Sequence, residues 1–356
     1  MTTAPSVATP RAAGYRQPAE WAEHRAVWIA WPSHADLWEA SLELVRTAWL
    51  EMASAVADPD PVGGAPRGER LEVLVPDERC ESLARSRMVG LPARFHRIPF
   101  GDIWLRDTAP VFVAGGDGVA AVSFAFNGWG GKYVLPDDDL VSPRVALAAR
   151  MRAFSFPQVL EGGSVEVDGA GTCLTTRQCL LNPNRNPGMS KEAVESLLRE
   201  ALGVETFLWL FEGLRNDHTD GHVDTLARFV SEGVAVCMRP SDGDDPNAAA
   251  LRDVERDLRS FRDAAGRKLE VVTVPSPGFV PDDEGRPSPA SYVNFYIGNR
   301  AVVVPTYGAP HDDLALRAFE PLFPGRRVIG VAARDLLSGG GAWHCITQQE
   351  PRGFLR

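Results

Sequence analysis

The chain has 356 residues, of which 44% are hydrophobic and 24% are charged, as in a globular protein with a large core. Its 47 acidic and 37 basic residues give a net charge of −10, and no basic run could neutralise the phosphates of a nucleic acid. No apolar run approaches the roughly 18 residues of a membrane-spanning helix, and none at the N-terminus has the length of a secretion signal. We therefore expect neither nucleic acids nor membranes as partners.

The cysteine content favours a reducing environment. The chain has five cysteines, an odd number, and no Cys-x-x-Cys motif. Because disulfides persist in oxidising compartments, this pattern indicates a cytoplasmic location. Residues 1–18 are rich in proline, alanine and threonine, and we expect them to form a disordered tail. Residues 19–356 contain no convincing interdomain linker, so we expect a single catalytic domain there.

Strand-like runs alternate with helix-like runs along most of the chain, which predicts an α/β fold. The clearest helix covers residues 190–202, where Ser190 can cap the first turn and Gly203 can end the last one. The other predicted helices cover 36–57, 77–88, 141–153, 247–265 and 312–322. In chain order the predicted strands cover 26–30, 71–75, 111–113, 119–124, 159–167, 223–230, 269–274, 292–297, 301–304 and 327–331.

One cysteine, Cys345, closely follows three consecutive glycines at 339–341. Glycine lacks a Cβ, so the backbone there can run close to a ligand. This presentation predicts a nucleophilic thiol. From this segment alone, a buried cysteine on a glycine-rich turn remains the alternative, because free cysteines are among the most buried residues.

Four further signatures place charged or amide side chains beside predicted strands. Their central residues, with the cysteine, are Asp107, Glu161, His222, Asn294 and Cys345, which are separated by 54, 61, 72 and 51 residues. Such near-regular spacing predicts about five supersecondary units, each bringing one polar group to a common centre, as blades do around an axis. The helices would then pack on the outside.

A thiol and an imidazole together can attack an electrophilic carbon, with the histidine moving protons to the leaving group. Nearby carboxylates would hinder ordinary acyl transfer, because they repel a developing oxyanion and raise the pKa of the thiol. They suit a cationic electrophile. A guanidinium offers a planar fork of N–H donors that Asp107 and Asp224 could grip, and its charge would favour the thiolate.

Each signature also has a simpler explanation. Asp107 could pair with the preceding Arg106, and Glu161 could mark a strand bulge. His218 and His222 could bind zinc together with a nearby carboxylate or Cys345. However, the residues after His222 are typical of a strand, where a separation of four residues places side chains about 13 Å apart. The sequence therefore favours no metal site.

In their order, these motifs resemble the guanidino-group-modifying, or pentein, superfamily, and within it the agmatine deiminase and bacterial peptidylarginine deiminase group. The resemblance runs from about residue 18 to residue 349 and implies an α/β fold built as a five-bladed propeller of ββαβ units around a central active site. The matching segments are Pro-Ala-Glu-Trp at 18–21, Trp-Leu-Arg-Asp-Thr at 104–108, Glu-Gly-Gly-Ser at 161–164, Asn-Pro-Asn-Arg-Asn-Pro at 182–187, Gly-His-Val-Asp at 221–224, Ser-Tyr-Val-Asn at 291–294 and the glycine-cysteine segment.

The resemblance implies a role for each site residue. Cys345 attacks the guanidinium carbon and forms an S-amidino intermediate, and His222 moves protons with the assistance of Glu161. The reaction needs neither a metal nor an organic cofactor. The residues that we expect to bind the substrate are Asp107, Asp224, Trp104, Asn294 and Asp220.

The resemblance favours agmatine as substrate, hydrolysed to N-carbamoylputrescine and ammonia, with Asp220 or Glu212 meeting the distal ammonium group. Ala342 and Trp343 replace the Asn-Ile that is usual in agmatine deiminases, a change that could reshape the substrate pocket. The alternatives are a deiminase of arginine or peptidyl-arginine, an amidinotransferase, and a non-catalytic guanidine-binding propeller. A homo-oligomer is compatible with all of them.

Overall fold

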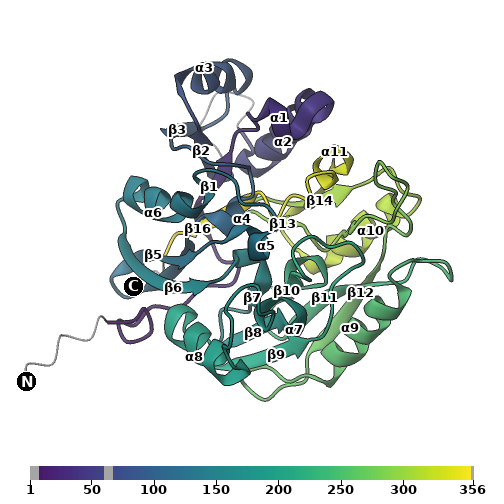
Figure 1. Cartoon of the computed structure of the whole chain (residues 1–356). Coiled ribbons are helices and arrows are strands. Elements are labelled where there is room, and N and C mark those ends of the chain that lie inside the picture. The colour runs from purple at the N-terminus through teal and green to yellow at the C-terminus, as the bar shows by residue number, and fades with distance from the viewer. Residues whose placement is uncertain (1–7, 60–66, 354–356) are drawn as a thin grey trace, which may run out of the picture.

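The computed structural model describes residues 8–59 and 67–353, and its strands form five sheets (Figure 1). Four of the sheets have three strands and one has four. The sheets are β16 (Thr347–Pro351), β1 (His24–Ala30), β2 (Arg70–Val75) and β3 (Ala93–Arg97); β4 (Val111–Gly115), β5 (Gly118–Ala125) and β6 (Arg152–Val159); β7 (Val165–Val167), β8 (Thr172–Thr176) and β9 (Thr206–Leu210); β10 (Ala227–Ser231), β11 (Val234–Arg239) and β12 (Glu270–Pro275); and β13 (Tyr296–Ile297), β14 (Ala301–Thr306) and β15 (Arg327–Ala332).

All five sheets share one pattern. An antiparallel pair is followed by a strand parallel to its second member, as in β4, β5 and β6. A parallel neighbour requires a crossover, and in each unit a helix makes it. These helices lie at the periphery in Figure 1. They are α2 (Leu42–Ala57), α6 (Asp138–Ala149), α8 (Lys191–Leu202), α9 (Ala248–Ser260) and α10 (Asp312–Phe319).

Shorter helices make up the connections. α3 (Glu78–Arg87) precedes the fourth strand of the largest sheet. The others are α1 (Ala35–Trp38), α4 (Leu105–Thr108), α5 (Gly128–Gly131), α7 (Arg177–Leu180), α11 (Arg334–Leu337) and the 3-10 turns η1 (Glu39–Ser41), η2 (Gly162–Ser164), η3 (Val223–Thr225) and η4 (Glu320–Leu322). The described part of the chain contains no helix that is both long and apolar enough to cross a bilayer.

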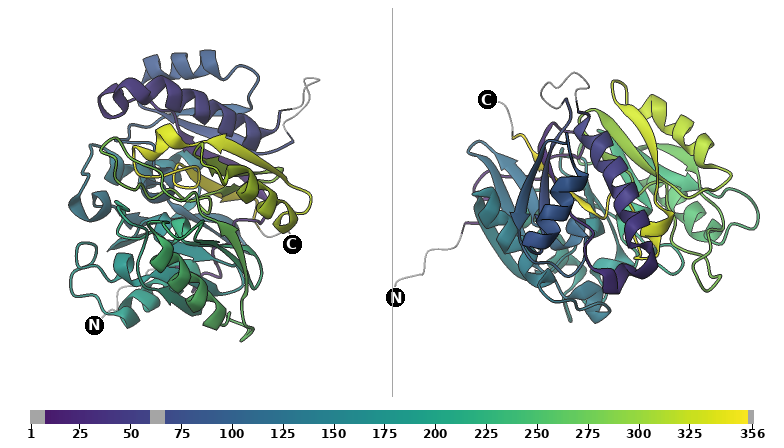
Figure 2. Two further views of the ribbon diagram at one scale, coloured as in Figure 1. Left: turned by 90° about the vertical axis from the view of Figure 1, so that its right-hand side faces the viewer. Right: turned by 90° about the horizontal axis from the view of Figure 1, so that it is seen from above.

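The two ends of the chain meet in one sheet. β16 pairs antiparallel with β1, with Ile29 opposite Thr347. In Figure 2 the C-terminal segment accordingly returns to the N-terminal part of the molecule. This pairing supplies the antiparallel pair of strands that the first unit would otherwise lack. It also places the residues just before β16 in the interior.

The structure confirms most predicted elements and corrects three strands. Helix α8 has the predicted cap, because the Ser190 side chain accepts a hydrogen bond from the Ala193 amide, and Gly203 ends it in the left-handed region. The predicted strands 159–167, 223–230 and 292–297 are each broken by a turn, so that β7, β10 and β13 begin later than expected. The predicted helix 36–57 is also interrupted, at Glu39, whose φ is 43°.

The expectation of a disordered tail over residues 1–18 is wrong for residues 8–18, and residues 1–7 lie outside the described range. Tyr15 is buried beside Phe154, with ring centroids 5.8 Å apart. Arg16 forms a backbone bridge with Ala114, in strand β4. This segment therefore packs along the β4 sheet, because its aromatic side chain can be removed from water there.

Candidate active site

The predicted reactive residues all precede the first strand of a sheet. Asp107 lies in α4 before β4, and Glu161 precedes η2 and β7. His222 begins η3 before β10, Asn294 comes shortly before β13, and Cys345 shortly before β16. Because the first strands occupy equivalent positions in the repeated pattern, their preceding turns meet in the interior. All five side chains are buried there.

Cys345 is enclosed, with 6% of the residue exposed. Asn294 Nδ2 donates to the sulfur at 3.2 Å, and Asp224 Oδ2 lies 3.7 Å from it. Burial raises the pKa of the Cys345 thiol well above its usual range, and Asp224 and Asp107 raise it further. The thiol therefore needs a positive charge beside it before it can ionise.

Gly341 explains why the segment before the cysteine is rich in glycine. A Cβ at this position would lie 2.7 Å from a ring carbon of Trp104 and 3.1 Å from the Cys345 sulfur. The missing side chain thus lets the indole of Trp104 approach the nucleophile. Trp104 is fixed by its own nitrogen, which donates to Asp102 Oδ2 at 2.7 Å.

A second glycine, Gly163, brings the histidine and the two aspartates together. A Cβ there would lie 2.6 Å from His222 Nδ1, 3.0 Å from Asp224 Oδ2 and 3.1 Å from Asp107 Oδ1. Its amide also donates to Asp107 Oδ1 at 2.9 Å. Any other residue would push these side chains apart, so Gly163 forms part of the floor of the site.

His222 lies 3.8 Å from Asp107, measured between Nδ1 and Oδ2. Burial lowers the pKa of His222, but the Asp107 carboxylate raises it, and the net result is well above the usual range. The ring therefore holds a proton that it can pass to a leaving group. Trp129 orients the aspartate, because its indole nitrogen donates to Asp107 Oδ2 at 2.9 Å.

Glu161 is fully buried, and burial raises the pKa of its carboxyl group against the opposing charge of Arg185. Arg185 Nε donates to Glu161 Oε1 at 2.8 Å. The sequence alone assigned no role to Arg185, although this residue lies in the Asn-Pro-Asn-Arg-Asn-Pro motif that contributed to the resemblance. Trp129 and Gly163 were missed in the same way, because their roles depend on contacts between distant segments.

Several buried polar atoms in this region have no hydrogen-bond partner within the part of the chain that the structure describes. They are Glu161 Oε2, both ring nitrogens of His222, and Asp224 Oδ1. A buried polar atom without a partner costs about 1–3 kcal/mol, so such a group of them indicates a ligand. Three carboxylates around a thiol suit a small planar cation with several N–H donors.

Glu161, Cys179 and His222 also have potential metal-ligand atoms within 4.8 Å of one another. The Arg185 guanidinium already binds this glutamate, and burial raises the pKa of the Cys179 thiol, which disfavours the thiolate that a metal would need. The zinc alternative built on His218 fails for a different reason. His218 is exposed and stacks on Tyr133, with ring centroids 5.6 Å apart, rather than joining His222.

Asp220, which we expect to contact the substrate, is bonded to protein side chains in this structure. Its Oδ2 accepts from Arg185 and from Asn184 Nδ2, and its Oδ1 accepts from Lys132 Nζ at 2.5 Å. These bonds lower the pKa of Asp220 despite its partial burial. The carboxylate thus binds protein cations and holds Arg185 in place. Glu212, the other candidate for the distal ammonium, is exposed.

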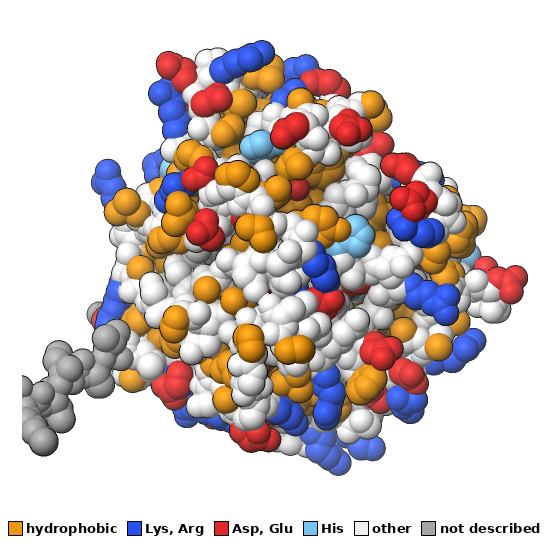
Figure 3. Space-filling view, in the orientation of Figure 1, with side chains coloured by type: hydrophobic (Ala, Val, Ile, Leu, Met, Phe, Trp, Pro, Cys, Tyr) orange, Lys and Arg blue, Asp and Glu red, His pale blue; other side chains and the backbone are white. Residues whose placement is uncertain are grey.

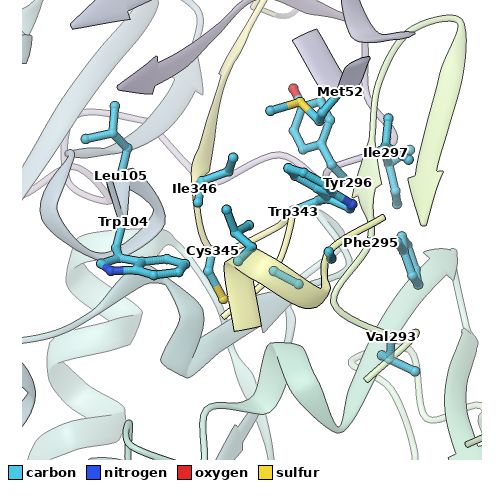
Figure 4. Close-up of a cluster of buried hydrophobic side chains, with 14 of the residues drawn as sticks. Met52, Trp104, Leu105, Val293, Phe295, Tyr296, Ile297, Trp343, Cys345 and Ile346 are labelled. Atoms are coloured by element: carbon cyan, nitrogen blue, oxygen red, sulfur yellow. The ribbon is translucent and has the colours of Figure 1, made fainter. Parts of the chain in front are cut away.

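Trp343, one of the two residues that could reshape the substrate pocket, lies in the core behind the nucleophile. Its side chain is fully buried, and its nitrogen donates to the Val331 carbonyl at 3.0 Å. Figure 4 shows it on the side of Tyr296, whereas the Cys345 sulfur points away from that side. The substitution therefore affects the core behind the nucleophile. Trp104 lies on the side of the sulfur in the same view.

The chain is similar to known proteins along its whole length. A model of the Porphyromonas-type peptidyl-arginine deiminase family matches residues 16–351. The agmatine deiminase of Ectopseudomonas mendocina is 40% identical, with 96% of this chain and 97% of that protein covered. That of Stutzerimonas stutzeri is 38% identical, with both chains fully covered. The solved agmatine deiminase of Enterococcus faecalis has a TM-score of 0.90 at 33% identity and covers 99% of this chain and 100% of its own. On this similarity and the site geometry, the chain belongs to the Porphyromonas-type peptidyl-arginine deiminase family.

Proposed function

We propose that the protein hydrolyses agmatine to N-carbamoylputrescine and ammonia. The observation that carries this proposal is a pair of buried carboxylate oxygens beside the Cys345 thiol, Glu161 Oε2 and Asp224 Oδ1, which have no hydrogen-bond partner among the described residues. A guanidinium can satisfy these acceptors and supply the charge that the thiol lacks. The full-length similarity to agmatine deiminases supports agmatine as the guanidino compound.

In the first half of the reaction, the Cys345 thiolate attacks the guanidinium carbon. A carbon–sulfur bond forms, His222 gives its proton to one terminal nitrogen, and the carbon–nitrogen bond breaks to release ammonia. Asp107 and Asp224 hold the remaining nitrogens in the correct plane. The product of this half is an S-amidino-cysteine.

In the second half, water replaces sulfur on the same carbon. His222, now neutral, takes a proton from the water, and Glu161 assists because its unpartnered Oε2 lies in the same buried region. The carbon–sulfur bond breaks, the oxygen of the water becomes the carbonyl oxygen of the ureido product, and the second proton of the water passes through the Glu161 carboxylate to the released ammonia, which leaves as ammonium. The thiolate and the protonated histidine are regenerated.

The decisive experiment measures ammonia release from agmatine, free arginine, an arginyl peptide and methylated arginine. We expect agmatine to have a kcat/KM at least about tenfold above the others. Preference for arginine or the peptide would replace the substrate assignment while leaving the chemistry intact. Absence of release from every compound by folded protein would refute the deiminase, and a new guanidino product with added amines would indicate amidino transfer.

Three further assignments belong to this proposal. The shared pattern of the five sheets supports a five-bladed propeller as the single catalytic domain that we expect over residues 19–356. The five free cysteines support a cytoplasmic location. Acidic and basic side chains are intermixed on the face in Figure 3, which supports a small cation rather than a nucleic acid or membrane as partner. A homo-oligomer is compatible with this fold, and its mass in solution can be measured directly.

A further inference from the structure

His344, which immediately precedes the nucleophile, lies between two carboxylates. Its ring is buried, with Nδ1 2.6 Å from Asp224 Oδ2 and Nε2 2.8 Å from Glu20 Oε2. A carboxylate only accepts hydrogen bonds, so a ring that bonds to both must carry a proton on each nitrogen. The geometry therefore describes an imidazolium cation next to Cys345.

The surrounding carboxylates favour this cation. Glu20 Oε2 also accepts from Arg228 at 2.8 Å and from Arg106 at 3.4 Å. Both oxygens of Glu166 accept hydrogen bonds, from Arg228 Nε at 2.7 Å and from the Phe229 amide at 2.9 Å. Three carboxylates face two arginines and His344 in this buried region. If His344 is charged, the carboxylates and the cations are equal in number. They are Glu20, Glu166 and Asp224 with Arg106, Arg228 and His344.

A single atom links the His344 ring to the Cys345 sulfur. Asp224 Oδ2, which binds the His344 ring, is the same oxygen that lies 3.7 Å from the Cys345 sulfur. Burial alone would raise the pKa of Asp224, but its hydrogen bond and charge interaction with His344 hold it below the usual range. The other oxygen of Asp224 has no partner among the described residues and is free to meet the substrate.

We propose that His344 is a positioning residue, held as an imidazolium between Asp224 and Glu20, which keeps the Asp224 carboxylate ionised and oriented and offsets its repulsion of the Cys345 thiolate. The histidine itself touches neither the substrate nor the reacting sulfur. The role rests on the proposed function only in naming the thiolate as the attacking group.

The test replaces His344 by Asn, whose Nδ2 can occupy the position of the ring Nδ1. His344→Asn thus keeps a neutral hydrogen bond to Asp224 and removes the charge. We expect the pH at which iodoacetamide alkylates Cys345 half-maximally to rise by about one unit, which corresponds to about tenfold slower alkylation at a fixed lower pH. We also expect the acid limb of kcat/KM to move to higher pH, because Asp224 becomes harder to ionise.

His24→Asn is the matched control. His24 is also buried and also bonds to a buried carboxylate, that of Glu69, but it lies at the opposite end of the β1–β16 pair from Cys345. We expect this variant to leave the pH dependence of alkylation unchanged. Unaltered pH profiles in His344→Asn, or an equal shift in both variants, would refute the proposal. Alkylation requires no substrate, so this result is independent of whether agmatine is the substrate.

A measurement on the unmodified protein covers the case in which the variant does not fold. In ¹⁵N NMR, an imidazolium has two protonated ring nitrogens, whereas a neutral ring has one. The His344 signals are identified by their change when the adjacent Cys345 is alkylated. We expect both nitrogens of His344 to be protonated in the folded protein, and a neutral ring under the conditions of the alkylation assay would overturn the assignment.

Discussion

Two adjoining regions of buried charge differ in how their polar atoms are used. The support cluster, formed by Glu20, Arg106, Glu166, Arg228 and His344, pairs its carboxylates with cations from distant parts of the chain. The reaction centre, formed by Asp107, Glu161, His222, Asp224 and Cys345, leaves one carboxylate oxygen each of Glu161 and Asp224 and the ring nitrogens of His222 without partners in the described chain. Both regions are almost fully buried.

The difference separates stability from catalysis. Buried ions are tolerated when each has a partner, and removing one partner is then costly. Unpartnered groups instead raise the free energy of the folded state, and a ligand can recover that energy on binding. Substitutions in the support cluster should therefore mainly lower stability, whereas substitutions in the reaction centre should mainly abolish turnover.

Replacement of the nucleophile should have the largest effect on activity. We expect Cys345→Ala to lower kcat on agmatine by at least about 10⁴-fold, because no covalent intermediate can form. The temperature of thermal unfolding should change little, since the hydrogen bond that is lost, from Asn294 Nδ2 to the sulfur, is a weak one. Steady-state kinetics and circular dichroism measure both quantities, and residual turnover within tenfold of the wild type would contradict the role of Cys345.

Replacement of Glu20 by Gln should have the largest effect on stability. Burial alone would raise the pKa of Glu20, but Arg228, His344 and Arg106 hold it well below its usual range. We expect Glu20→Gln to lower the free energy of unfolding at pH 7 by about 3 kcal/mol. The depressed pKa of Glu20 contributes its full stabilisation above the unfolded value of about 4.5, and this contribution is lost as the pH falls from there through the folded value. The difference between wild type and variant should therefore shrink below pH 4.5. Urea denaturation at several pH values measures it.

Glu161→Gln is the same substitution in the reaction centre and should behave in the opposite way. Burial raises the pKa of Glu161, so ionisation of its carboxyl group reduces stability as the pH rises above the unfolded value. We expect the variant to match or exceed the wild-type free energy of unfolding at pH 7, by up to about 1 kcal/mol. Its turnover should fall by about 10²-fold or more. An equal loss of stability in both Gln variants would remove the distinction between the two regions.

A smaller effect should come from the tryptophan that orients Asp107. Trp129→Phe removes the indole donor but keeps most of the ring, so we expect a rise in KM of about fivefold to tenfold, the value of one hydrogen bond to a charged group. Trp49→Phe is the control, because the buried indole nitrogen of Trp49 has no partner among the described residues. The role of Trp129 fails if both variants retain the wild-type KM.

The smallest effect on stability and KM should come from Lys132, at the partly exposed edge of the site. Lys132 binds Asp220, but about a third of its side chain is exposed, and such ion pairs contribute little. We expect Lys132→Met to change the free energy of unfolding by less than about 0.5 kcal/mol and KM by less than twofold. A tenfold rise in KM would show that the rim pair belongs to the reaction centre.

The sequence predicted the alternation of strands and helices and the residues that lie together in the candidate site, but it missed strands β3, β6, β8, β9, β11 and β16. Helix α8 was predicted closely, because its cap and its terminal glycine are local signals. The strands at 223–230 and 292–297 were predicted too long because strand-forming residues continue through the turns that present His222 and Asn294. At 159–167 the prediction passed over Gly162-Gly163-Ser164, which form the turn after Glu161. Local propensity does not register that these side chains must face a common centre.

The support cluster could not be predicted in the same way. Glu20 stands in a short motif near the N-terminus, whereas its partner Arg228 is more than 200 residues away and reads as part of a strand. Without knowledge of the fold, a charged residue in a strand predicts that its face of the sheet is exposed to solvent. The pairing of Asp220 with Lys132 could not be predicted for a related reason, because it joins two loops that lie far apart in the sequence.

The pairing of β1 with β16 has a consequence for how the protein folds. The hydrogen bond between Trp28 and Glu350 joins residues 322 positions apart, and contacts of such long range form slowly because a large loop must close first. The turn that carries Cys345 is anchored by this same pair. A chain in which every other sheet has folded would still lack the turn that holds the Cys345 thiol in place. The rate of Cys345 alkylation during refolding would therefore report when β16 pairs with β1.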